Sequence, residues 1–152
     1  MTRILLSFIL LSLFPGPLLY SQSISKGTIE ITFKNIRNQD GWITIGINHR
    51  NPEGFPRKAD IELQFEKEGM KDGSLTVQVK DQPYGMYAIS VLDDENRDLE
   101  IEMFMGIPRE GFGFSTNPPF KLRAPRFEEC SFEVNQPVTK ISIDLRYAGK
   151  GR

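Results

Sequence analysis

The stretch LTVQVKDQPYGMYAISVL, residues 75–92, decides the fold class of this 152-residue chain. Apolar and polar residues alternate from Leu75 to Val79, and the alternation resumes from Tyr87 to Val91, after the turn signal Pro83-Tyr84-Gly85. A period of two residues is typical of a β-strand with one buried face, because successive side chains point to opposite sides of a sheet. The stretch therefore predicts two strands joined by a short turn.

The same period recurs in five further segments, which are separated by turn-forming Gly, Pro, Asn and Asp. Their apolar members are Ile29, Ile31 and Phe33; Ile43, Ile45 and Ile47; Ile61, Leu63 and Phe65; Phe132 and Val134; and Ile141, Ile143, Leu145 and Tyr147. No segment has the pattern of an amphipathic helix. About seven short strands at this spacing predict an all-β fold, a single antiparallel β-sandwich.

The N-terminus has the pattern of a secretory signal peptide. Arg3 is followed by an apolar run over residues 4–13, which is too short to span a membrane, and then by Pro15-Gly16-Pro17 and the small residue Ser21. We expect residues 1–21 to be removed and residues 22–152 to form the domain, in the periplasm or outside the cell. The alternative is an uncleaved N-terminal anchor; no other segment approaches the length of a transmembrane span.

Composition excludes several classes of function. A net charge of −1 gives no basic footprint for nucleic acid. One His and one Cys rule out a disulfide framework and a Cys/His zinc site. Cys130 alternates with Phe132 and Val134, which places it on the apolar face of a strand, either as a small buried hydrophobe or as a reactive thiol.

One predicted strand is apolar on both faces. Met86, Ala88 and Leu92 occupy the positions between Tyr87, Ile89 and Val91. A sandwich strand needs only one dry face, so another segment should cover the second. The candidate is the long Gly/Pro/Phe-rich loop over residues 106–127, which we expect to fold back over this sheet.

An acidic run over residues 93–102 is the candidate metal site. Asp94, Asn96, Asp98 and Glu102 could offer oxygen ligands to calcium, the only cofactor that the sequence suggests. Leu99 stands where a calcium loop needs glycine, and Arg97 lies inside the loop. The alternative is a solvated acidic hairpin loop without an ion.

Three blocks of sequence carry a resemblance to a known family. They are Pro83-Tyr84-Gly85-Met86-Tyr87-Ala88, then Asp94-Glu95-Asn96, then Gly106-Ile107-Pro108-Arg109-Glu110-Gly111-Phe112-Gly113-Phe114-Ser115. The chain resembles the secreted bacterial domain of unknown function number 2141, with patterns P-x-G-x-Y-A, H-D-E-N-x-N-G-x-x-D and G-I-P-x-E-G-x-G-F-S. The resemblance implies a signal peptide, an immunoglobulin-like or prealbumin-like β-sandwich, and no known activity. This chain departs from the second pattern, with Asp93 in place of His and Asp98-Leu99 in place of Asn-Gly.

The third block also has a physical interpretation. Gly111 and Gly113 free the backbone to adopt positive φ, and Phe112 and Phe114 project on one side if the stretch is extended. The two aromatic side chains either pack onto the sheet or, with Arg109 and Glu110, bind a partner.

Three functional hypotheses follow. The first is a non-enzymatic binding or interaction module of the cell envelope, whose partner is a protein or a glycan. The second is a calcium-stabilised structural domain that uses the acidic loop. The third and weakest is a hydrolase that uses a pair of carboxylates, for which no spacing in the sequence argues. Nothing in the sequence specifies an oligomeric state.

Overall fold

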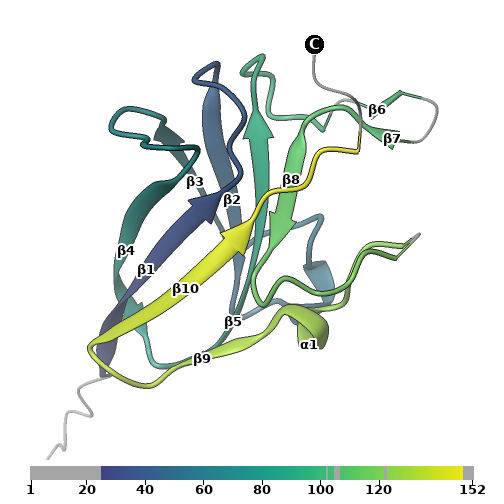
Figure 1. The fold of residues 1–152 in the computed structure, drawn as a ribbon. Coiled ribbons are helices and arrows are strands. Elements are labelled where there is room, and N and C mark those ends of the chain that lie inside the picture. Colours follow the sequence, from purple (N-terminus) through teal and green to yellow (C-terminus); the bar gives the residue numbers. More distant parts are fainter. Residues whose placement is uncertain (1–24, 102, 105–106, 122, 149–152) are drawn as a thin grey trace, which may run out of the picture.

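The computed structural model describes residues 25–101, 103–104, 107–121 and 123–148, and shows two β-sheets packed face to face (Figure 1). The first sheet has the order β10-β1-β4, with β1 at Lys26–Lys34, β4 at Leu75–Pro83 and β10 at Val138–Asp144. The second has the order β3-β2-β5-β8, with β3 at Ile61–Glu66, β2 at Trp42–Asn48, β5 at Gly85–Asp94 and β8 at Gly111–Phe114. The predicted all-β sandwich is confirmed.

Short elements complete the chain. They are β6 at Met103–Phe104 and β7 at Ile107–Pro108, which pair with each other; β9 at Phe132–Val134, which pairs with β5; a 3-10 turn at Pro52–Gly54; and α1 at Phe127–Cys130. Among the described residues, no helix combines the length and apolarity needed to cross a membrane. The predicted signal peptide lies outside the described residues.

All seven predicted strands are present, and two features were not predicted. The segment over residues 106–127 is not wholly a loop, because it contains β7 and β8. One strand pair, β1 with β10, is parallel, with Thr28 opposite Val138 and Lys34 opposite Asp144. The parallel pair arises because β9 pairs with β5 in the second sheet, after which the chain turns at residues 135–137 and enters the first sheet beside β1.

The core lies between the sheets and consists of the alternating residues that the sequence pattern selects. Ile29, Ile31 and Phe33 of β1 are fully buried. They face Ile43, Ile45 and Ile47 of β2, together with Tyr87, Ile89 and Val91 of β5. Burial of each such side chain contributes roughly 1.5–3 kcal/mol relative to its exposure, so these three strands supply much of the driving force for folding.

Cys130 is buried, as one of the two sequence interpretations expects, but it is not in a strand. It ends α1, a single helical turn in which the Glu129 carboxylate accepts a hydrogen bond from the Arg126 amide at 2.8 Å. This local hydrogen bond offers the backbone an alternative to the extended conformation, and the strand begins only at Phe132. Burial raises the pKa of the Cys130 thiol to about 12, which keeps it in the unreactive protonated form.

Candidate binding site

The outer face of the second sheet forms the floor of a cavity of about 640 Å³. Two rows of side chains cross β2, β5 and β8 on this face. The rows are Thr44, Leu92 and Phe112, and Gly46, Ser90 and Phe114, each in register across the three strands. Residues opposite one another in neighbouring strands point to the same face, so the two rows form one continuous surface.

Glycine places Phe112 and Phe114 on this floor. Gly111 and Gly113 alternate with them on β8 and face the core, where they are buried. A Cβ atom on Gly113 would lie 2.8 Å from Cγ2 of Ile143, and one on Gly111 would collide with the ring of Tyr147. The expectation of positive φ at these glycines is wrong, since positive φ occurs at Gly41, Gly69, Gly73 and Gly85 instead. Instead, Gly111 and Gly113 allow β8 to lie close to the C-terminal strand region, residues 143–147.

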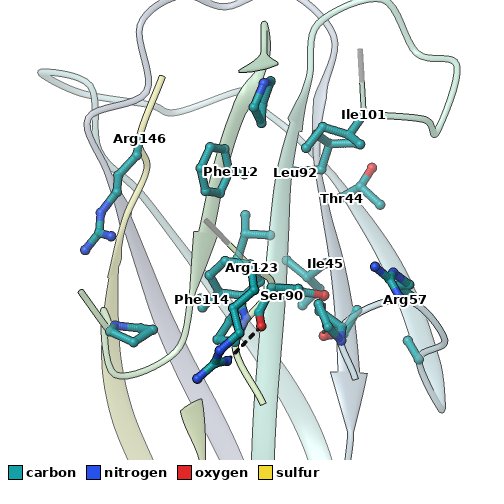
Figure 2. Close-up of a pocket in the computed structure, with 18 of the residues that line it drawn as sticks. Thr44, Ile45, Arg57, Ser90, Leu92, Ile101, Phe112, Phe114, Arg123 and Arg146 are labelled. Carbon is teal, nitrogen blue, oxygen red and sulfur yellow. Dashed lines mark hydrogen bonds between the residues drawn. The ribbon is translucent and has the colours of Figure 1, made fainter. Parts of the chain in front are cut away.

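Three segments build the walls above this floor (Figure 2). The residues that line the cavity are Pro56, Arg57 and Ala59 in the first segment; Leu99, Ile101, Met103 and Pro108 in the second; and residues 118–121 and 123–125 in the third. Seven large hydrophobic side chains are exposed among the described residues, and four of these line the cavity: Leu99, Ile101, Met103 and Phe120. Exposed apolar side chains that gather around one hollow mark a binding surface more strongly than the same number scattered singly.

Phe114 and Phe127, both within the 106–127 segment, cover part of the outer face of β5, while the middle of that face stays open. Ala88 is fully buried, in a cluster with Phe55 and Cys130 against which Phe114 and Phe127 pack. Beyond Ala88, the half-buried Ser90 and Leu92 face the cavity. The second apolar face recognised in the sequence is therefore closed near Ala88 and becomes the cavity floor near Leu92.

Charged side chains surround this apolar floor. Four cations and two carboxylates line the cavity among the described residues: Arg57, Lys121, Arg123 and Arg146, with Glu62 and Glu129. Glu129 is shared, because its carboxylate lies 2.5 Å from Nζ of Lys121 and accepts two hydrogen bonds from Arg123 at 2.7 and 2.9 Å. These neighbours hold the pKa of Glu129 far below its usual range. The lining therefore has a net positive charge.

The structure separates the four residues predicted to bind a partner. Phe112 and Phe114 line the cavity, and their ring centroids lie 6.2 Å apart. Glu110 is buried, and its Oε1 accepts a hydrogen bond from the amide of Glu95 at 3.1 Å. The carbonyl oxygen of Arg109 accepts a hydrogen bond from Arg37 at 3.3 Å. Arg109 and Glu110 thus lie away from the described cavity lining, beside the acidic loop.

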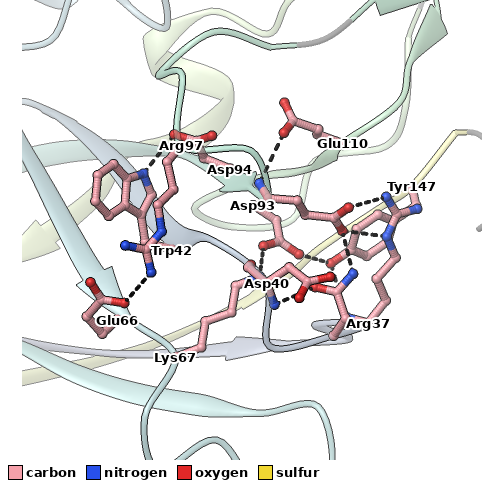
Figure 3. Close-up of polar contacts among 12 residues, drawn as sticks. Arg37, Asp40, Trp42, Glu66, Lys67, Asp93, Asp94, Arg97, Glu110 and Tyr147 are labelled. Carbon is pink, nitrogen blue, oxygen red and sulfur yellow. Dashed lines mark hydrogen bonds and ion pairs between the residues drawn. The ribbon is translucent and has the colours of Figure 1, made fainter.

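The described part of the acidic loop, residues 93–101, is held by hydrogen bonds within the loop and by one from β2, which Figure 3 shows between Trp42 and Asp94. Asp94 is buried, and its carboxylate accepts bonds from Trp42 Nε1 at 2.7 Å and from the amides of Leu99 and Asp98 at 3.0 and 3.2 Å. The Asn96 side chain donates to Asp98 at 2.7 Å. The oxygen atoms of Asp94, Asn96 and Asp98, three of the predicted calcium ligands, therefore already accept hydrogen bonds from donors of the protein.

No group of three or more His, Cys, Asp or Glu side chains within the described ranges is arranged to hold a metal ion. Glu102, the fourth predicted ligand, lies outside those ranges. Calcium binding stays a prediction. The hydrogen bonds of Asp94 offer an alternative explanation for the acidic side chain at this position, one that needs no ion.

A buried polar cluster joins this loop to the core. Lys67 and Asp93 form an ion pair with almost fully buried side chains, and the hydroxyl of Tyr147 donates to the same carboxylate. Burial raises the pKa of Asp93, while Lys67 and Tyr147 oppose that shift. Arg37 donates to both carboxylate oxygens of Glu95, at 2.6 and 2.7 Å, and holds the pKa of Glu95 below its usual range.

Sequence reasoning missed both this cluster and most of the cavity. Lys67 stands between two glutamates, a pattern that indicates a solvated surface, and nothing in the sequence pairs it with Asp93. The exposed apolar side chains at residues 99, 101 and 103 were a usable signal, because they interrupt an otherwise polar stretch. Arg57 carried no signal, since its position depends on the path of the 56–59 segment.

Fold and site together define a small all-β sandwich with an apolar, cation-rimmed hollow on one sheet. The model of a bacterial family matches residues 31–142, and the chain belongs to that family, described as uncharacterized protein conserved in bacteria (DUF2141). The resemblance predicted from the three sequence blocks is confirmed. No solved structure matches the chain.

Proposed function

We propose that this protein is a non-enzymatic binding module of the bacterial cell envelope that holds a hydrophobic small molecule on the outer face of its second sheet. The cavity of about 640 Å³ carries this proposal. Ligand cavities typically occupy about 300–1,000 Å³ and are lined mainly by apolar and aromatic side chains with a few polar groups.

The exposed apolar side chains of the walls support the same function. Leu99, Met103 and Phe120 are each more than half exposed. Covering apolar surface is favourable by roughly 25 cal/mol per Å², so a hydrophobic ligand would gain free energy from these side chains as well as from the floor.

The chemistry of the lining favours a hydrophobic small molecule over a glycan, one of the two partners expected from the sequence. A glycan offers many hydroxyl groups, each of which needs a polar partner when it is desolvated. The two rows of the floor provide few such partners, since Thr44 and Ser90 are their only polar side chains and the charged groups of the lining surround the floor. The expected signal peptide over residues 1–21 supports an envelope location for the module.

Binding of the neutral hydrophobic dye N-phenyl-1-naphthylamine to the purified protein tests the proposal, because its fluorescence rises in an apolar site. We expect saturable binding that Leu92→Glu weakens at least tenfold, since the new carboxylate would lie on the apolar floor. Met86→Glu is the matched control. Met86 lies on the same strand and the same face as Leu92, is 45% exposed, and does not line the cavity.

The two variants decide the outcome together, with folding of each checked by its circular dichroism spectrum and melting temperature. Loss of dye binding in Leu92→Glu alone supports the cavity as the site. The absence of saturable binding to the unmodified protein, or equal loss in both variants, would reject the proposed function.

A further inference from the structure

We infer that the ligand carries an anionic group, a carboxylate or a phosphate, at one end of its apolar body, and that Arg57 is the residue that binds this group. The inference rests on the proposed function and names the class of ligand. It follows from the charges around the cavity and from the way in which those charges are already paired.

The cavity lining has more cations than the protein itself neutralises. Among the described residues, four cationic side chains line the cavity and only two carboxylates do. The chain as a whole has a net charge of −1, so this excess is local. A cationic excess beside an apolar floor matches a molecule with an apolar body and a negative end.

Arg57 is the cation most available to a ligand. Lys121 and Arg123 share the carboxylate of Glu129. Arg146 donates to the carbonyl oxygen of Asn117, at 3.5 Å. By contrast, the guanidinium of Arg57 forms no ion pair or hydrogen bond with any residue that the structure describes, whereas the amide of Arg57 donates to Gly54.

The position of Arg57 suits this role. In Figure 2 it stands at one side of the cavity, opposite Arg146, with Arg123 between them. Its neighbours in the wall, Pro56 and Ala59, are uncharged, and the carboxylate of Glu62, which also lines the cavity, forms no ion pair with it. A guanidinium binds a carboxylate or a phosphate through two parallel hydrogen bonds, and such charge-assisted bonds are stronger next to apolar surface than in open water.

The test compares four ligands with the same dodecyl chain and different head groups. Dodecanoate and dodecyl phosphate are anionic, dodecyl maltoside is neutral, and dodecyltrimethylammonium is cationic. Each is titrated below its micelle concentration against the purified protein loaded with N-phenyl-1-naphthylamine. We expect at least one anionic ligand to displace the dye about tenfold more tightly than the neutral and cationic ones, and the stronger of the two anions identifies the head group.

Arg57→Gln should remove this preference, so that the variant binds the anionic ligands no more than about twofold more tightly than dodecyl maltoside. Lys58→Gln is the matched control, since it removes the same charge from the adjacent exposed residue, which does not line the cavity. Equal affinity for all four head groups, or a preference that survives in Arg57→Gln, would overturn the inference while dye binding still supports the proposed function. Failure of the dye itself to bind would instead reject the proposed function.

Discussion

Replacement of Lys67 by methionine tests the buried ion pair between Lys67 and Asp93. Methionine replaces the aliphatic part of the lysine side chain, out to the ε position, and lacks the ammonium group with its charge and its hydrogen bonds. The side chains of Lys67 and Asp93 are 1% and 0% exposed, so neither charge can be rescued by solvent when the other is removed. The variant therefore leaves a carboxylate in the interior with Tyr147 as its remaining partner.

The expected cost is about 3–5 kcal/mol of unfolding free energy at neutral pH, the range for breaking a buried ion pair by removal of one partner. Lys67 also donates to the carbonyl oxygen of Asp40 at 2.5 Å, and loss of that bond contributes to the cost. Because domains of this size are stable by about 5–15 kcal/mol, the variant should still fold. Asp93→Asn added to Lys67→Met should recover part of the loss, since the amide keeps an acceptor for Tyr147 without the charge.

The loss should depend on pH in a defined direction. Burial raises the pKa of Asp93 above its unfolded value, and Lys67 opposes that shift, so removal of Lys67 raises the pKa further. A raised carboxyl pKa costs stability as the pH rises through the unfolded value of about 3.9 toward the folded value. The difference between Lys67→Met and the unmodified protein should therefore be smallest near pH 4 and largest at neutral pH.

Urea unfolding followed by fluorescence of Trp42, the single tryptophan, measures these differences at both pH values. Lys71→Met serves as the control, because this lysine is exposed and the substitution is the same. A loss below about 1 kcal/mol at neutral pH, or one equal at both pH values, would refute the claim that the buried charge pair governs stability at this end of the sandwich.

Three further predictions concern the acidic loop and the buried thiol. Asp94→Ala should lower the free energy of unfolding by about 1–3 kcal/mol, because the variant loses the hydrogen bonds from Trp42 and from the loop amides. The loss should be the same in EDTA and in millimolar calcium. A melting temperature that calcium raises in the unmodified protein but not in Asp94→Ala would show instead that the loop binds the ion. Glu95→Gln should lower the free energy of unfolding by about 1 kcal/mol at neutral pH. The depressed pKa of Glu95 supplies stability that is present above the unfolded pKa of about 4.3 and is lost as the pH falls through the folded pKa. The stabilities of the variant and the unmodified protein should therefore converge in acid. Cys130 should resist Ellman's reagent in the native protein and react completely in urea, and fast reaction under native conditions would contradict its burial.

The alternation of apolar residues predicted the sandwich because every central strand buries every second side chain against the opposite sheet. Ile43, Ile45 and Ile47 are fully buried, and each is separated from the next by a half-buried residue. β8 escaped prediction because Gly111 and Gly113 occupy its core-facing positions, where other strands carry branched apolar side chains. Glycine is needed at these two positions because Tyr147 and Ile143 lie against them. Both residues are distant in sequence, so no local pattern could indicate that β8 is a strand.

The cavity escaped prediction for a related reason. The sequence indicated that β5 has two apolar faces and that Phe112 and Phe114 share a side, and both observations hold in the structure. It could not indicate whether the covering segment lies flat on Leu92 or stands away from it, because that depends on where three separate loops cross the sheet. Residues 56–59 contribute Arg57 from a region with no regular pattern at all.

The last two residues of β5 connect the polar cluster to the cavity. Asp93 points into the sandwich, where Lys67 and Tyr147 hold it, and Asp94 points to the outer face, where it accepts a hydrogen bond from Trp42. The carboxylate of Asp94 also binds the amide of Leu99, at 3.0 Å, and Leu99 is part of the cavity wall. Asp93 and Asp94, neighbours in the acidic run, thus each have a structural role. Asp93 accepts a hydrogen bond from Tyr147, just after β10, and Asp94, one of the predicted calcium ligands, fixes the loop that carries the wall.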